Sequence, residues 1–120
     1  MKKMRLVSPF TDEAYLVTGI SEEKLGVFIK TTYPDYKGWV DGKALGRMED
    51  PEKDGIKYHY IWIDPTMIKA EMRLTLVHEA IHLVTSIFED CGIPISLAND
   101  ETFAYVHGSF CEQLFKHYKL

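Results

Sequence analysis

Long apolar runs are missing from this sequence, and their absence narrows what the chain can be. The basic start, Met1-Lys2-Lys3-Met4-Arg5, is followed by only Leu6 and Val7 before Ser8-Pro9. No apolar stretch is long enough for a signal peptide or for a helix that crosses a membrane. We therefore expect a cytoplasmic protein that has no membrane partner.

Cysteine is also scarce, with Cys91 and Cys111 as the two examples. Their spacing matches neither a zinc knuckle nor a CxxC redox motif, which argues against a metal or disulfide framework built from cysteine. Two isolated cysteines in a chain of cytosolic character are usually reduced and packed against neighbours. We expect two free thiols.

An excess of basic residues is the third missing feature. The chain has 14 Lys and Arg against 18 Asp and Glu, for a net charge of −4, and nothing resembles the basic stripe that a nucleic-acid partner requires. The 46% of hydrophobic and 27% of charged residues are typical of a globular protein. The length suits one hydrophobic core, so we expect a single domain over residues 1–120.

The N-terminal half contains patterns typical of β-strands. Residues 14–18 and 27–32 are rich in β-branched and aromatic side chains, and residues 19–26 between them carry a glycine at each end. This arrangement predicts a hairpin.

Residues 56–63 predict a further strand, because large side chains alternate between Ile56, Tyr58, Tyr60 and Trp62 on one face and Lys57, His59, Ile61 and Ile63 on the other. We expect both of its faces to be covered.

The C-terminal half contains the patterns of two helices. Asp64-Pro65 is a typical helix start and Gly92 a typical stop. Within these limits one core face is predicted from the helical spacing of Ala70, Leu74, Val77, Ile81, Val84 and Phe88. Asn99 or Asp100 can cap a second helix that runs to about His117. Strands followed by helices predict an α+β fold.

The first helix carries His78-Glu79-Ala80-Ile81-His82, an HExxH pattern. Side chains at i and i+4 leave the same face of a helix, so both imidazoles can approach one ion. Glu79 leaves about 100° further round and can reach a water beside that ion without becoming a ligand. The pattern indicates Zn²⁺ bound by His78 and His82, with Glu79 as the general base.

A third ligand is needed, because a catalytic zinc site normally has three protein ligands. Carboxylates beyond His82 on the same helix lie about 10 Å away, so this ligand must come from another element. Glu101, in the first turn of the second helix, is the leading candidate, and Asp100 and His107 are alternatives. Tyr105 and His107 follow closely and are candidate donors to an oxyanion.

With these residues the chain resembles the gluzincins, zinc metallopeptidases in which HExxH is completed by a glutamate on a following helix. His78, Glu79 and His82 match, and Asn99-Asp100-Glu101-Thr102-Phe103-Ala104 is similar to the family's Asn-Glu-x-x-Ala/Ser segment. The resemblance covers residues 56–118. It implies a zincin-like fold, in which a small, twisted, mainly antiparallel sheet packs on the two helices, and a zinc ion held by His78, His82 and Glu101.

The function expected from these residues is zinc-dependent hydrolysis of a peptide or protein substrate. Glu79 takes a proton from the attacking water and passes it to the leaving nitrogen, and Tyr105 or His107 stabilises the oxyanion. The alternative is a non-catalytic, metal-binding interaction module on a zincin scaffold, for example in a small phage or mobile-element protein. A catalytic site keeps an open cleft beside Glu79, whereas a structural site is closed by a fourth protein ligand.

Overall fold

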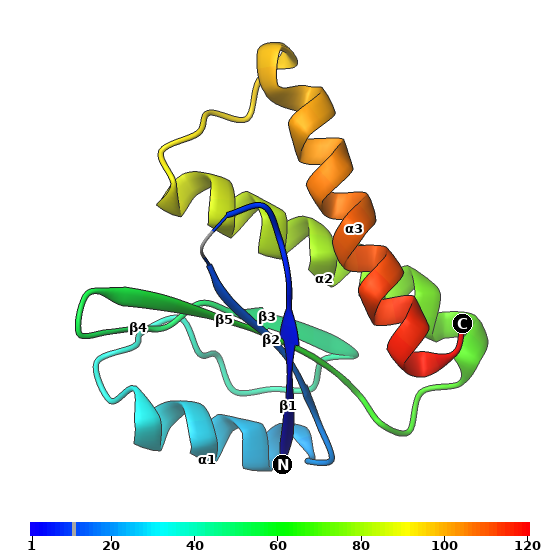
Figure 1. The fold of residues 1–120 in the computed structure, drawn as a ribbon. Helices are drawn as coiled ribbons and strands as arrows, with labels where there is room; N and C mark the ends of the chain where they lie inside the picture. Colours follow the sequence, from blue (N-terminus) through cyan, green and yellow to red (C-terminus); the bar gives the residue numbers. More distant parts are fainter. Residues whose placement is uncertain (11) are drawn as a thin grey trace.

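The structure is a computed structural model that describes residues 1–10 and 12–120. Its elements, in chain order, are β1 (Lys2–Leu6), β2 (Glu13–Thr18), α1 (Glu22–Thr32), β3 (Gly46–Glu49), β4 (Glu52–Lys53), β5 (Ile56–Ile63), α2 (Lys69–Asp90), the 3₁₀ helix η1 (Leu97–Asn99) and α3 (Asp100–Tyr118). One face of the sheet is covered by α1 and the other by α2, on which α3 packs (Figure 1). The predicted α+β class is confirmed.

The sheet has the strand order β1-β2-β5-β3, and β4 also pairs with β5. The β1–β2, β3–β5 and β4–β5 pairs are antiparallel, as predicted, whereas β2 and β5 are parallel. The parallel pair arises because α1 and β3 lie between these two strands in the sequence, and α1 crosses over one face of the sheet. Since β3 ends the strand order, one of its edges has no strand beside it in the described part of the chain.

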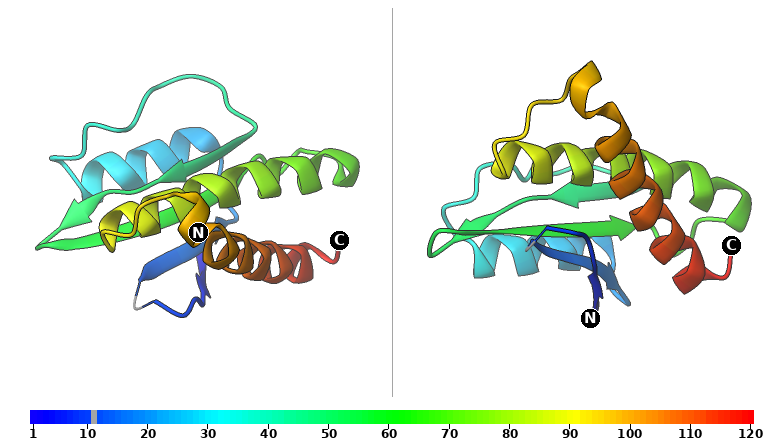
Figure 2. Two further views of the ribbon diagram at one scale, coloured as in Figure 1. Left: turned by 90° about the horizontal axis from the view of Figure 1, so that it is seen from above. Right: turned by 45° about the horizontal axis from the view of Figure 1, so that its top comes forward.

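Strand β5 is covered on both faces, as its alternating large side chains predict (Figure 2). Tyr60 and Trp62 pack in one buried cluster with Leu25 and Ile29 of α1. The opposite side chains, Ile61 and Ile63, belong to a second cluster, which the sheet forms with α2 and α3. Two hydrophobic cores therefore lie on either side of one sheet.

The predicted hairpin over residues 14–32 is wrong in its second half, because residues 22–32 form α1. The side-chain oxygen of Ser21 accepts a hydrogen bond from the backbone N–H of Lys24 at 3.3 Å and thereby caps the helix. Leu25 and Ile29, one helical turn apart, are its buried residues together with Gly26. Capping and helical spacing outweigh the β-branched composition of this segment.

Helix α2 begins at Lys69, later than the predicted start at Asp64-Pro65. Asp64 instead accepts hydrogen bonds from Thr66 within a turn. The predicted core face is correct for Val84 and Phe88, which are buried, and Val77 is partly buried. It is wrong for the exposed residues Ala70, Leu74 and Ile81. The reason is that the face that packs on the sheet and α3 is rotated by about 100° from the predicted one. Its buried residues are Leu76, Glu79, Ala80, Leu83, Val84, Ser86, Ile87 and Phe88.

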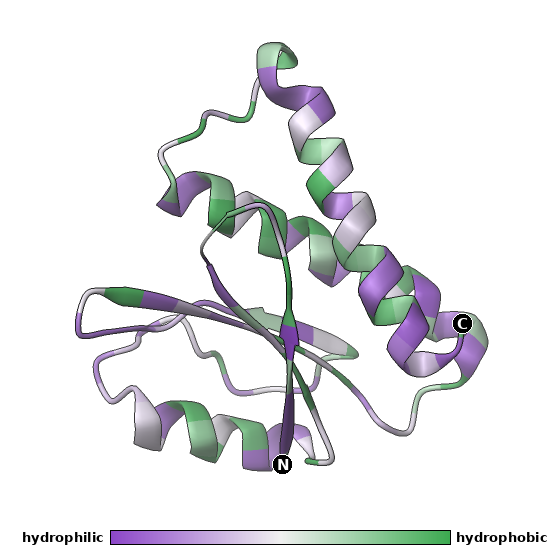
Figure 3. Ribbon diagram, viewed as in Figure 1, coloured by the Kyte–Doolittle hydropathy of each residue, from purple (hydrophilic) through white to green (hydrophobic). Residues whose placement is uncertain are grey.

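Hydrophilic and hydrophobic residues alternate along α2 and α3 (Figure 3). No helix in residues 1–10 and 12–120 combines the length and the apolar character needed to cross a membrane. Cys91, which is exposed, and Cys111, which is buried, are free thiols.

Candidate functional site

The flank of α2 that carries the two histidines is fixed by the packing of the helix. Ser86 Oγ on α2 lies 3.1 Å from Nε2 of the buried His59 on β5, so the side of α2 that carries Ser86 faces the sheet. The backbone oxygen of Val77 lies 3.2 Å from His107 Nε2, so the side of α2 at Val77 faces α3. His78 follows Val77 by about 100° and turns away from α3.

His78 and His82 lie close enough to share one ion. Their Nε2 atoms are 3.1 Å apart, and the rings meet edge to face with centroids 4.8 Å apart. Two imidazole nitrogens bound to one tetrahedral zinc ion, each at about 2.0–2.1 Å, are separated by about 3.3 Å. The pair therefore fits as two donors for such an ion, and both side chains are exposed to solvent.

The side chain of Glu79, which belongs to α2, faces β3 and is only 7% exposed. The backbone of Gly46 comes so close that a Cβ there would be 3.0 Å from Glu79 Cγ and 3.3 Å from Glu79 Oε1. Burial raises the pKa of the Glu79 carboxyl group, and the nearby Glu49 raises it further, against the opposing effects of His78 and Arg47. The Glu79 side chain is thus packed closely against β3.

Two hollows meet at Glu79, and we call the two together the groove. The first, of about 430 Å³, we call the leucine hollow; it is lined by Leu45, Gly46, Leu74, Thr75, His78 and Glu79. The second, of about 460 Å³, we call the loop hollow; it is lined by residues 40–44 and 46–49 together with Glu79 and His82. Each histidine faces one hollow, while Glu79 and Gly46 line both. The arrangement gives a ligand access to the histidine pair from two sides.

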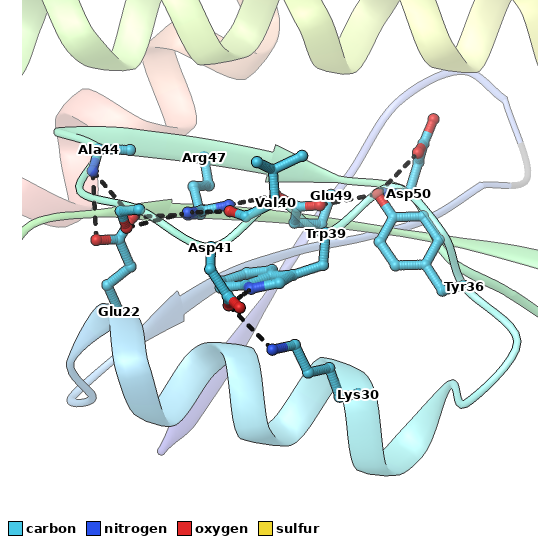
Figure 4. A network of polar contacts seen from close by, with 11 residues as sticks. Glu22, Lys30, Tyr36, Trp39, Val40, Asp41, Ala44, Arg47, Glu49 and Asp50 are labelled. Carbon is cyan, nitrogen blue, oxygen red and sulfur yellow. Dashed lines mark hydrogen bonds and ion pairs between the residues drawn. The ribbon is translucent and has the colours of Figure 1, made fainter.

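Arg47 holds the loop that forms the outer wall of the loop hollow (Figure 4). Its guanidinium donates to Glu22 of α1 at 2.7 Å and to the backbone oxygen of Val40 at 2.8 Å. The same group stacks on the ring of Trp39, 3.9 Å from the ring centroid. Its side chain is only 11% exposed, so these contacts are largely shielded from water. They connect α1, the loop and β3.

Two further contacts attach the loop to α1. Glu22 also accepts a hydrogen bond from the backbone N–H of Ala44, at 3.0 Å. Asp41 accepts from both Lys30 and the Trp39 indole, each at 2.9 Å (Figure 4). Two side chains of α1, Glu22 and Lys30, therefore hold the wall of the loop hollow.

A buried polar chain continues from this wall into the core. The Tyr36 hydroxyl donates to Glu49 at 2.8 Å, and Ser86 on α2 donates to Asp50 at 2.8 Å. Burial raises the pKa of the Glu49 carboxyl group. Because the Ser86 proton points to Asp50, the His59 Nε2–H donates to Ser86. This chain fixes α2 relative to β3 on the side opposite α3.

The structure does not bring Glu101 to the histidine pair. Phe103, whose ring centroid lies 5.4 Å from that of Phe88, and His107 turn toward α2. Glu101 and Tyr105 leave α3 about 120–160° away from those two side chains, so they point away from α2. Both are exposed, Tyr105 by 73%.

The remaining candidates on α3 are also outside the groove. His107 is half-buried at the α2–α3 contact, where its Nε2 lies 3.5 Å from Cys111 Sγ, and it lines neither hollow. Asp100 is exposed at the start of α3. Within the described residues, no group of three or more His, Cys, Asp or Glu side chains could hold a metal ion. The three-ligand set of His78, His82 and Glu101 is therefore absent from this structure.

Comparisons with protein-family models, curated proteins and solved structures found no match to this chain. The identification as a gluzincin is accordingly wrong, because no comparison supports it and the described residues lack the three-ligand metal group that defines it. The physical reason is that α3 packs on a flank of α2 about 100° from His78, and Glu101 points away from α2. What remains is the pair of histidines, the buried glutamate and the groove.

Sequence reasoning missed the residues that build the other side of the groove. Gly46, Arg47 and Glu49 lie in a stretch with glycines at positions 38, 42 and 46, whose pattern predicts no regular element. A signal was present in Gly46-Arg47-Met48-Glu49, where charged side chains alternate with a glycine and a methionine as on an edge strand. That strand could not be aligned with α2 from sequence alone.

Proposed function

We propose that this protein is a zinc-dependent hydrolase that cleaves peptide bonds or similar amides, with His78 and His82 as metal ligands and Glu79 as the general base. The observation that carries the proposal is the 3.1 Å separation of the two Nε2 atoms beside a buried glutamate that lines both hollows. Two imidazoles at this spacing, next to a carboxylate and an open groove, suit metal-assisted hydrolysis.

Zinc, when bound, supplies a Lewis acid and lowers the pKa of an adjacent water. The protein supplies the rest. The carboxylate of Glu79 accepts the proton of the attacking water and then gives it to the leaving nitrogen. Its contact with Gly46 and its burial limit its rotamers, so the proton acceptor stays aimed at the groove.

An extended peptide is the substrate shape that the groove favours. Strand β3 ends the sheet order and lies along α2 beside Glu79. A free strand edge offers backbone donors and acceptors to a peptide chain that lies alongside it. Such pairing recognises the main chain and holds an amide bond next to the histidines.

The incomplete ligand set favours a second candidate, a metal-binding interaction module without catalytic activity. Two histidines bind zinc more weakly than three ligands do, and the remaining positions are left to solvent, substrate or a partner. In a module, a donor from the partner completes the site and no bond is cleaved. The two candidates differ in the role of Glu79, which only the hydrolase requires as a base.

The test is cleavage of a peptide library by protein loaded with zinc, compared with the Glu79→Gln variant. The hydrolase proposal predicts cleavage that is abolished by a chelator, restored by zinc, and lost in Glu79→Gln although that variant still binds zinc. The matched control is Glu89→Gln, an exposed position on the same helix, which should cleave as wild type does. Zinc binding without any cleavage by the wild type would instead support the interaction module.

A further inference from the structure

The two walls of the leucine hollow present aliphatic side chains to solvent. Leu45, just before β3, is 60% exposed, and Leu74, in the first part of α2, is 76% exposed. Single exposed apolar residues are common on protein surfaces and need no explanation. Here, however, the two leucines come from different elements and line one hollow of about 430 Å³ that also contains Glu79.

The two hollows differ in the ionisable side chains that line them. Asp41, Lys43, Arg47 and Glu49 all line the loop hollow, and none of them lines the leucine hollow. Apart from His78, the only ionisable group in the leucine hollow is Glu79, whose side chain is 7% exposed. An aliphatic group that binds there covers leucine surface and takes water from no charged side chain other than His78 and Glu79.

Gly46 places the two hollows on either side of one reacting position. It lines both hollows together with Glu79, and a Cβ at this position would be 2.7 Å from Thr75 Cγ2. The absence of a side chain at Gly46 lets β3 approach α2 closely at the position that both hollows share. A chain that lies along β3 across Glu79 thus has its neighbouring side chains in different surroundings.

We propose that the leucine hollow is a binding site for one aliphatic side chain of an extended peptide, at a position adjacent to the bond that lies over Glu79. This inference rests on the proposed function, which it deepens by naming the substrate class: peptides with leucine-like residues at that position. Side chains such as aspartate or serine are selected against, because they exchange hydration for contact with Leu45 and Leu74.

The experiment measures binding rather than cleavage, so that its failure is distinct from failure of the proposed hydrolysis. Fluorescein-labelled pentapeptides of alanine, with leucine, serine or aspartate at the centre, are titrated with zinc-loaded Glu79→Gln protein and followed by anisotropy. The leucine peptide should bind at least about tenfold more tightly than the serine peptide. Leu74→Asp should remove this preference, as should Leu45→Asp.

The matched control is Leu97→Asp, which changes a leucine in η1 that is 90% exposed and lines neither hollow. It should keep the preference of the parent protein, and circular dichroism should give the same thermal transition for all three substitutions at these exposed sites. Equal affinity for the leucine and serine peptides would overturn the inference, as would loss of the preference in Leu97→Asp or failure of all three peptides to bind. If the preference is present but the wild type cleaves no peptide, the binding site stands and only the hydrolase proposal fails.

Discussion

Gly46 and Glu79 are in such close contact that β3 and α2 leave no room for a side chain at residue 46. A Cβ on Gly46 would lie 3.0 Å from Glu79 Cγ and 2.7 Å from Thr75 Cγ2. Contacts of this kind force neighbouring atoms to move. The position of the strand edge and the position of the general base are thus set by one backbone contact.

Gly46→Ala is therefore expected to destabilise the protein by about 1–3 kcal/mol, because the added methyl group overpacks the contact between β3 and α2. Urea unfolding measures this change. Thr75→Ser removes the Cγ2 atom that the new methyl meets first, so the double variant should recover part of the loss.

The control is Gly108→Ala, where a Cβ meets no atom within 4 Å and the helix gains up to about 1 kcal/mol. Equal effects at positions 46 and 108 would contradict the described contact.

Arg47→Lys is expected to cost about 1–3 kcal/mol of unfolding free energy, although the charge is kept. A lysine cannot donate at once to Glu22 and to the Val40 backbone oxygen while it stacks on Trp39. The comparison is Arg5→Lys, whose side chain is 49% exposed and whose pair with Glu13 should matter by less than about 1 kcal/mol. If both substitutions have the same small effect in urea, the network does not hold the loop.

Stability should fall as the pH drops below about 6.5, through the buried His59. Burial lowers the pKa of His59 from its ordinary value of 6.5, against the opposing charges of Asp50, Asp12 and Asp90. Between 6.5 and the lower folded-state pKa, the unfolded chain binds the extra proton, so unfolding becomes easier as pH falls. The slope from this one group is at most about 1.4 kcal/mol per pH unit.

The measurement for His59 is urea unfolding at pH 7.5 and pH 5.5, for wild type and for His59→Gln. The glutamine amide can still donate to Ser86, but it does not titrate. The wild type should lose more stability than the variant over this range. An equal loss in both proteins would show that other groups cause the pH dependence.

The sequence predicted the elements with strong periodic patterns and missed those that depend on tertiary contacts. Strand β5, with its two covered faces, and the end of α2 near Gly92, where φ is +70°, follow from alternation and from glycine's access to that backbone region. Helix α1 was missed because residues 27–32 also have β-strand composition, and only its Ser21 cap and the Leu25–Ile29 spacing distinguish it.

The site was predicted in part, for the same reason. Local spacing on one helix brings His78 and His82 together, and the structure has them 3.1 Å apart. The position of Glu101 depends on how α3 packs, which the sequence does not specify, and α3 lies against Val77 and Phe88 on the other flank of α2. The partners of Glu79 come from β3, a strand of four residues in a glycine-containing stretch.

The central claim is that His78 and His82 bind one metal ion together, and calorimetric titration of zinc into metal-free protein tests it most directly. We predict one zinc site per chain in the wild type, loss of that site in both His78→Ala and His82→Ala, and an unchanged site in the control His117→Ala, which alters an exposed histidine on α3. Absence of zinc binding by the wild type, or a site that survives both substitutions on α2, would contradict the account.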